Sequence, residues 1–144
     1  MIKEIESRRS IRRYKDIPVK KELIEEILKA GMLAPSSKNR QPWHFIVTTG
    51  SAKEQVLKAM EAGLKREEKQ PFLPESAPYL DGARATLKIM KEAPVIIFIT
   101  DPLASPMDQP LAIDERVSEI CNAQSVGAAI ENMTLAATEL GLGS

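Results

Sequence analysis

The 144-residue chain is organised around Ala34-Pro35-Ser36-Ser37-Lys38-Asn39-Arg40-Gln41-Pro42-Trp43-His44-Phe45. This stretch places two serine hydroxyls and two side-chain carboxamides between an amphipathic helix and an apolar strand, and prolines stiffen both of its ends. Asn and Gln each offer a donor and an acceptor, and a Ser hydroxyl rotates to either role. The stretch predicts a polar cradle for the edge of a ligand. A well-capped connection without a ligand uses the same residue types and is the alternative.

A second motif, Ser7-Arg8-Arg9-Ser10-Ile11-Arg12-Arg13-Tyr14, places four arginines within six residues. Cations this close repel one another unless anions neutralise them, and guanidinium and hydroxyl groups suit phosphate oxygens. A solvated basic turn, or salt bridges to nearby Glu, is the alternative for this segment. Together, the two stretches indicate a nucleotide-like ligand with a phosphate at one end and a polar ring at the other.

Both stretches, in this order and at this spacing, resemble the nitroreductase family of flavin enzymes. The late segment 127–144, which ends in Leu140-Gly141-Leu142-Gly143-Ser144, adds a third match, whereas residues 50–115 add little. The resemblance implies an α+β chain with a three-layer α/β/α fold, a mixed and mainly antiparallel sheet, and a long central helix. It also implies one flavin-binding domain over residues 1–144.

By this resemblance, Arg8, Arg9, Ser10 and Arg12 hold the phosphate and ribityl chain of FMN, while Arg13 is an exposed neighbour. The cradle residues that hold the ring or ribityl chain, in this case of a flavin bound mainly by the other subunit, are Pro35, Ser36, Ser37, Asn39 and Gln41. Gly143 and Ser144 are expected near the ring. No acid, base, nucleophile or metal ligand is assigned, because the flavin carries the chemistry.

The implied function is an FMN-dependent NAD(P)H oxidoreductase that reduces nitroaromatics, quinones or similar small-molecule acceptors by a ping-pong route, as a homodimer. One alternative is a flavin-binding or flavin-sequestering protein with little turnover, and another is a scaffold without cofactor. The sequence does not identify the physiological electron acceptor. NADH and NADPH are not distinguished, because no Gly-x-Gly-x-x-Gly fingerprint occurs.

The chain stops at Ser144, where family members continue with a loop near the flavin, a closing strand and a C-terminal segment. We therefore expect either a truncated chain or further residues beyond Ser144, and residues 1–144 alone leave an apolar strand edge without its neighbour. Weaker retention of the cofactor is the expected consequence.

Composition excludes several other classes of protein. Twenty basic residues balance twenty acidic ones, so no global field argues for nucleic acid or a membrane surface as partner. A single cysteine allows no internal disulfide, and no apolar run reaches the roughly 20 residues that span a bilayer. A cytoplasmic protein is expected, because the N-terminus also lacks the apolar core of a signal peptide.

Hydrophobic periodicity predicts the order of helices and strands. We expect a short helix over 2–9 with Ile2 and Ile5 on one side, and an amphipathic helix over 20–32 whose buried stripe includes Met32. Strands are expected over 44–49 and 95–100, the second buried on both faces. Both strands are expected to share one sheet that packs against the helix from about residue 114 to 140. Further helices are expected from a Ser51 cap to about residue 60, over 80–91, and from about 113 to 140. A glycine C-cap is expected to end the last helix in the segment 141–144, because Gly accepts the left-handed conformation. Residues 63–79 and 101–110 are expected to be irregular.

Small residues crowd the last helix and leave few wholly polar faces, so a partner subunit is expected to cover it. Cover by the chain itself is the alternative. His44, the single histidine, is interpreted as structural, because no Ser, Cys or second ligand is spaced to make it catalytic or metal-binding.

Overall fold

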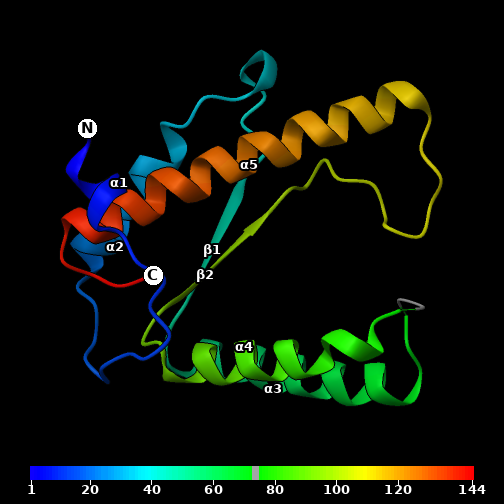
Figure 1. Ribbon diagram of the computed structural model, residues 1–144, viewed down its shortest axis with the longest axis horizontal. Helices are drawn as coiled ribbons and strands as arrows, with labels where there is room; N and C mark the ends of the chain where they lie inside the picture. The colour runs from blue at the N-terminus through cyan, green and yellow to red at the C-terminus, as the bar shows by residue number, and fades with distance from the viewer. Residues whose placement is uncertain (73–74) are drawn as a thin grey trace. The chain divides into compact units, whose positions relative to one another are not determined.

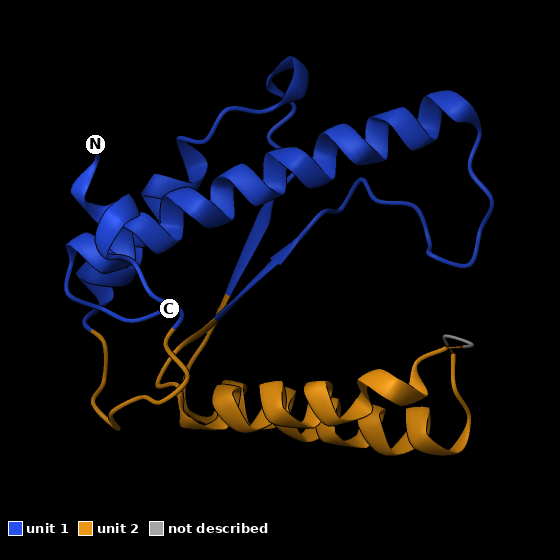
Figure 2. Cartoon of the chain, in the orientation of Figure 1, with its two compact units in different colours: residues 1–10, 20–46, 97–144 blue, residues 11–19, 47–96 orange. Residues whose placement is uncertain are grey.

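The computed structural model describes residues 1–72 and 75–144, which form two compact units (Figure 2). The first unit contains residues 1–10, 20–46 and 97–144, and the second contains residues 11–19 and 47–96. Of the irregular segment expected over 63–79, Leu73 and Pro74 lie outside the described residues. The predicted α+β class is confirmed, because long helices accompany a small antiparallel sheet.

Nine elements follow one another along the described chain (Figure 1). In order they are α1 (Lys3–Ser7), α2 (Lys21–Met32), the 3-10 turn η1 (Ser37–Asn39), β1 (His44–Thr48), α3 (Gly50–Lys69), the 3-10 turn η2 (Ala77–Tyr79), α4 (Leu80–Glu92), β2 (Ile96–Thr100) and α5 (Ile113–Glu139). Every helix and strand expected from the sequence is present, and residues 101–110 are irregular as expected.

The two strands form one sheet, as expected. At one end, the Thr48 hydroxyl donates to the Ile96 carbonyl at 3.2 Å, and at the other the Thr100 hydroxyl donates to the His44 carbonyl at 3.5 Å. The first residue of each strand therefore lies opposite the last residue of the other, which makes the pair antiparallel.

The core of the first unit lies between the sheet and α5. Buried residues of α5 recur at spacings of three and four, the repeat of one helix face: Asn122, Ser125, Ala129, Met133 and Ala137. Met133 and Ala137 pack with Ile27 of α2, and Phe45, Ile97 and Ile99 of the two strands complete the cluster. The expected packing of the sheet on this helix is confirmed.

Burial differs from expectation at two places. Only Ile96 of β2 is buried, and the other residues of this strand are half-buried or exposed. The expectation that β2 is buried on both faces is therefore wrong for the described chain. Ile97 and Ile99 pack toward α5, while the alternate residue Phe98 lies on the other face. Met32 is 52% exposed and does not belong to the buried stripe of α2.

The second unit contains the hairpin of α3 and α4. Lys53 of α3 donates to the carbonyls of Lys91 and Ala93 at 3.3 and 2.7 Å, which satisfies two acceptors at the end of α4. The Lys91 ammonium donates to Glu61 at 3.3 Å. This hydrogen bond and the charges of Lys91 and Lys65 lower the pKa of Glu61.

Helix α3 is longer than expected. The expected end near residue 60 is wrong, because the helix continues to Lys69 through residues 63–69, which contain the strong helix formers Lys, Arg and Glu. The expected Ser51 cap is also wrong, since the N-cap is Thr49 and no side chain caps the helix there. The expected helix over 2–9 is confined to α1, and Ile2 and Ile5 are exposed.

Helix α5 ends in a left-handed glycine cap. Gly141 has φ +74°, its N–H donates to the Thr138 carbonyl at 3.1 Å, and the Leu142 N–H donates to the Ala137 carbonyl at 2.8 Å. This pair of bonds is the Schellman arrangement, and Leu142 packs on the core cluster. The predicted glycine cap is confirmed. None of the described helices, α5 included, is long and apolar enough to cross a membrane.

We expect Gly141→Ala to destabilise the chain by about 1 to 2 kcal/mol, because an L-residue is strained at this φ. A Cβ added at Gly141 would meet no heavy atom within 4 Å, so the backbone alone carries this cost. Gly63→Ala, in the middle of α3, is the control and should stabilise by about 0.5 to 1 kcal/mol. Urea unfolding followed by circular dichroism measures both changes, and equal effects of the two substitutions would contradict the left-handed cap.

Candidate functional site

The cradle loop, residues 34–45, connects α2 to β1 in the first unit and is anchored from inside the fold. The Ser37 N–H donates to the Ser125 hydroxyl of α5 at 3.2 Å, and the Gln41 N–H donates to the Ser36 hydroxyl at 3.0 Å. Pro42 is fully buried. The loop is therefore held at both ends and to the long helix, so its polar side chains project from a rigid support.

Three residues of the loop have left-handed backbone conformations without being glycine. Lys38 and Asn39 both have φ +53°, and Gln41 has φ +50°. Asn adopts this region at modest cost, whereas Lys and Gln rarely do. Such strain persists only where the surrounding contacts enforce it, and it is concentrated at binding and catalytic sites. Nothing in the spacing of the sequence predicted this feature.

The side chains of Asn39 and Gln41 form the polar edge of the loop. Gln41 Nε2 donates to Asn39 Oδ1 at 3.3 Å, and both residues are exposed. Within the described ranges 1–72 and 75–144, no protein group bonds to Asn39 Nδ2 or Gln41 Oε1. One donor and one acceptor are therefore presented side by side, a pattern that matches the edge of a heteroaromatic ring.

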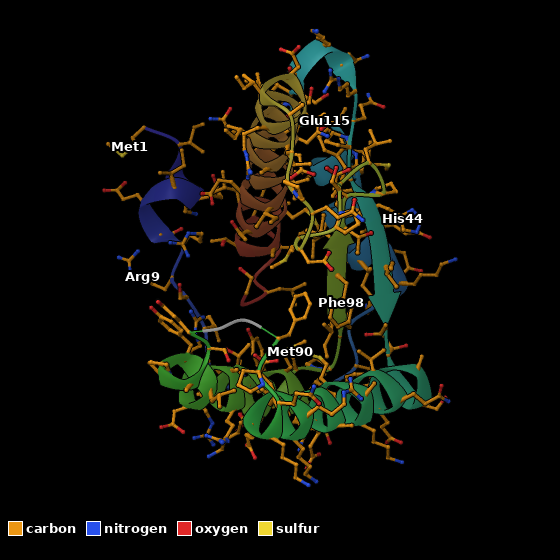
Figure 3. The ribbon with its side chains drawn as sticks, turned by 90° about the vertical axis from the view of Figure 1, so that its right-hand side faces the viewer. Met1, Arg9, His44, Met90, Phe98 and Glu115 are labelled. Atoms are coloured by element: carbon orange, nitrogen blue, oxygen red, sulfur yellow. The ribbon has the colours of Figure 1, made fainter. Side chains whose placement is uncertain are left out.

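The arginine segment follows α1, which packs on α5 in the first unit. The Arg9 guanidinium donates to the carbonyls of Glu6 and Arg8 at 2.9 and 2.7 Å, and Figure 3 shows this side chain standing away from the ribbon beyond α1. In the part of the chain that the structure describes, neither Arg8 nor Arg9 pairs with a carboxylate, and Ser10 makes no side-chain hydrogen bond. These groups remain available to an anion.

Arg12 and Arg13 belong to the second unit. The Arg12 guanidinium donates to the neighbouring Ile11 carbonyl at 3.1 Å, and no described carboxylate pairs with it. Arg13 pairs with Glu92 at 2.9 Å and is otherwise exposed. The four arginines that are close in sequence therefore differ in their surroundings, and Arg13 is already neutralised by a carboxylate.

The structure brings some predicted site residues into the same unit but does not join them. Arg8, Arg9 and Ser10, the whole cradle loop, and Gly143 and Ser144 all lie in the first unit, whereas Arg12 does not. No hydrogen bond connects the arginine segment to the loop among the described residues. Gly143 and Ser144 are exposed and follow the glycine cap of α5.

Two polar residues of α5 were missed as candidates. Ser125 is buried, donates its hydroxyl proton to the Cys121 carbonyl at 2.7 Å, and accepts from the loop at Ser37. Asn122, one turn earlier, is 4% exposed, and its Oδ1 has no hydrogen-bond partner in the described chain. Both interrupt an otherwise apolar buried stripe with polar groups, and that periodicity is the signal that could have identified them.

The structure offers no metal centre in the ranges it describes, since no three His, Cys, Asp or Glu side chains gather there. His44 is exposed at the start of β1 (Figure 3), and its carbonyl accepts the hydrogen bond from Thr100. The residues brought together are instead amides, hydroxyls and cations, which bind and orient a ligand but do not themselves transfer electrons.

Comparison with known proteins relates the chain to flavin enzymes. The sequence model described as the nitroreductase family matches residues 5–144. A protein of Archaeoglobus fulgidus, named for NADH dehydrogenase or NAD(P)H nitroreductase activity, is 35% identical over 143 residues, which is 99% of this chain and 64% of the relative. A protein of the same name from Methanothermobacter thermautotrophicus is 33% identical over 146 residues, and this match covers 100% of this chain and 58% of the relative.

Solved structures agree with the sequence matches. The crystal structure of a Desulfovibrio desulfuricans protein, described as a nitroreductase in complex with FMN, has a TM-score of 0.63 and 32% identity to this chain. The match covers 98% of this chain and 63% of that one. The chain therefore spans less than two thirds of the length of each of these three relatives.

Proposed function

Because the chain belongs to the nitroreductase family, we propose that it acts in FMN-dependent transfer of electrons from NAD(P)H to nitroaromatic, quinone or similar acceptors by a ping-pong route. The observation that supports this proposal most is the cradle loop, whose strained backbone holds the free edges of Asn39 and Gln41 outward. In the same proposal, residues 1–144 contribute to one flavin-binding domain of a cytoplasmic enzyme.

The donor set fits FMN. A phosphate needs cations without carboxylate partners, and in the described chain Arg8 and Arg9 meet this need together with the hydroxyl of Ser10. Arg12, which pairs with no described carboxylate, is proposed as a further phosphate or ribityl contact. A flavin ring edge alternates carbonyl acceptors with an N–H donor, and the cradle residues that complement it or the ribityl chain are Pro35, Ser36, Ser37, Asn39 and Gln41. Gly143 and Ser144 are proposed near the ring.

When bound, FMN supplies the exchange of a hydride or electrons between the nicotinamide and the second substrate. The protein's own residues bind and orient. Arg8, Arg9 and Ser10 neutralise and hold the phosphate, while Asn39 and Gln41 set the orientation of the ring. No side chain of the chain is assigned a proton-transfer or nucleophilic role.

We further propose that the active form is a homodimer built on α5. This helix is apolar on two opposite faces: one carries the buried core stripe, and the other carries Ile113, Val117 and Ile120, which are 83%, 54% and 51% exposed. Gly127 lies on the same exposed face, and a Cβ added there would meet nothing within 4 Å. A large apolar face on a helix marks an interaction surface, and the absence of a side chain at Gly127 permits close approach of a second backbone.

The test is spectroscopic. The purified chain mixed with FMN should show a perturbed flavin spectrum, NAD(P)H should bleach it in the absence of oxygen, and a nitroaromatic or quinone should restore it. If the protein binds flavin but NAD(P)H does not bleach it, the chain sequesters flavin and the proposed reaction is wrong. If the protein does not change the flavin spectrum, the chain is a scaffold without cofactor.

The phosphate contacts predict a preference for FMN over riboflavin. Charge-assisted hydrogen bonds contribute about 1.5 to 3 kcal/mol each, so Arg8→Ala should weaken FMN binding by about 10- to 100-fold and leave riboflavin binding nearly unchanged. Flavin fluorescence quenching measures both constants.

Arg13→Ala is the matched control, because Arg13 is already paired with Glu92 and its loss should leave both affinities unchanged. Equal affinity of the unmodified chain for FMN and riboflavin would show that the arginines form a solvated basic turn. Equal losses in the Arg8 and Arg13 variants would show a general charge effect instead of a site.

A further inference from the structure

Two cations flank the polar edge of the cradle loop. Lys38 and Arg40 lie on either side of Asn39, and both are exposed. Within residues 1–72 and 75–144, no carboxylate pairs with either side chain, and neither side chain donates a hydrogen bond. Some cations elsewhere in the described chain are paired, as Arg13 is with Glu92 and Lys91 is with Glu61. The loop therefore presents two uncompensated positive charges beside its free amides.

The sequence around Lys38 and Arg40 contains no acidic residue that could neutralise them. No Asp or Glu occurs between Glu26 and Glu54, although the chain as a whole has equal numbers of acidic and basic residues. The segment of α5 that anchors the loop, residues 121–125, carries no charge either. A local positive potential beside an overall neutral protein favours an anion at this position.

The backbone of the loop fixes the positions from which the Lys38 and Arg40 side chains extend. Lys38 itself has φ +53°, and the Arg40 N–H donates to the Ser37 carbonyl at 3.1 Å within the turn that Ser125 anchors. A ligand beside the amides of Asn39 and Gln41 is therefore near two cations whose backbone positions are already fixed, so binding does not pay the cost of ordering the loop first.

We infer that the site selects aromatic electron acceptors that carry an anionic group, such as a carboxylate or sulfonate. Lys38 and Arg40 are the specificity-determining residues for the anionic substituent, and both lie next to the amide edge of Asn39 and Gln41 that orients the flavin ring. This inference rests on the proposed function, because it names the class of acceptor for that reaction. An anion should bind about tenfold more tightly than its neutral isostere at low ionic strength, and the preference should shrink as salt is added.

The single tryptophan provides a test that does not require turnover. Trp43 is three residues from Arg40 and stacks on Phe45, with ring centroids 6.4 Å apart. Nitroaromatics quench indole fluorescence at close range, so titration with 4-nitrobenzenesulfonate and with neutral 4-nitrobenzenesulfonamide reports binding beside the loop. Free N-acetyltryptophanamide corrects for absorbance by the titrant.

The double variant Lys38→Gln/Arg40→Gln should bind the two compounds equally. The matched control is Lys58→Gln/Lys69→Gln, which removes from α3 two exposed cations that pair with no carboxylate in the described chain, and it should retain the tenfold preference. Equal affinities in the unmodified chain would overturn the inference, and so would a preference that survives in the Lys38/Arg40 variant.

A third titrant distinguishes an acceptor from a dinucleotide phosphate. If adenosine 2′,5′-bisphosphate displaces the sulfonate and loses affinity in the same double variant, the cations serve the nicotinamide cofactor and the inference is wrong. Failure of the proposed function is seen separately, as a flavin that NAD(P)H does not bleach, because these titrations use neither flavin nor NAD(P)H.

Discussion

Ile120→Glu should give a chain that sediments as a monomer at micromolar concentrations at which the unmodified chain sediments as a dimer. Ile120 lies at the middle of the exposed apolar face of α5 with half of its surface accessible, so the monomer tolerates a carboxylate there. In a two-fold dimer the substitution occurs twice. Each buried, unpaired charge costs about 3 to 5 kcal/mol, so dimerisation should weaken by more than about 100-fold.

Ile17→Glu is the control, because Ile17 is similarly exposed but belongs to the second unit and not to α5. It should leave the dimer intact. Sedimentation velocity over a range of concentrations measures both variants, and circular dichroism shows whether they fold. A monomeric unmodified chain, or a dimer insensitive to Ile120→Glu, would mean that this face of α5 does not contact a second copy.

Gly31→Ala and Met133→Ala should each destabilise the first unit, and together they should cost less than the sum. A Cβ at Gly31 of α2 would lie 2.9 Å from Met133 Cγ and Sδ and 3.0 Å from Phe45 Cζ. Met133 is itself buried in the core, so it has little room to move. The added methyl should cost about 1 to 3 kcal/mol by overpacking, and Met133→Ala should cost about 2 to 5 kcal/mol by leaving a cavity.

The double variant places the new methyl beside the space that Met133 vacates. The coupling free energy should therefore favour the double variant by at least about 1 kcal/mol, which urea unfolding of the four proteins measures. Gly82→Ala in α4 is the control, since a Cβ added there would meet no atom within 4 Å, and helix propensity should stabilise the variant by about 0.5 to 1 kcal/mol. Strict additivity at Gly31 and Met133 would contradict the close contact of α2 with α5.

Local patterns in the sequence were sufficient to locate most of the helices and strands. Apolar spacing of three and four located α2 and α5, and short β-branched runs located β1 and β2. The expected end of α3 near residue 60 is too early, because the charged run after Gly63 consists mainly of the helix formers Lys, Arg and Glu. A single helical glycine costs only about 1 kcal/mol, which neighbouring helix formers and packing on α4 overcome.

For the candidate site, too, some features could be predicted from the sequence and others could not. Residue types alone indicated a phosphate-binding arginine segment and a cradle of hydroxyls and amides, because the chemistry of a side chain does not depend on its place in the fold. They did not indicate that Arg13 is neutralised by Glu92, 79 residues away in sequence. Nor did they single out Ser125, whose role depends on a loop 88 residues earlier.

The class of fold, the order of the elements and the glycine cap of α5 could be predicted from sequence, because each depends on the conformational preferences of neighbouring residues. Tertiary packing decided which face of α5 is core and which is exposed, because both faces carry apolar residues and periodicity cannot rank them. It also decided the left-handed backbone of Lys38, Asn39 and Gln41. These conformations cost energy locally and exist because anchors distant in sequence, Ser125 among them, hold the loop against that cost.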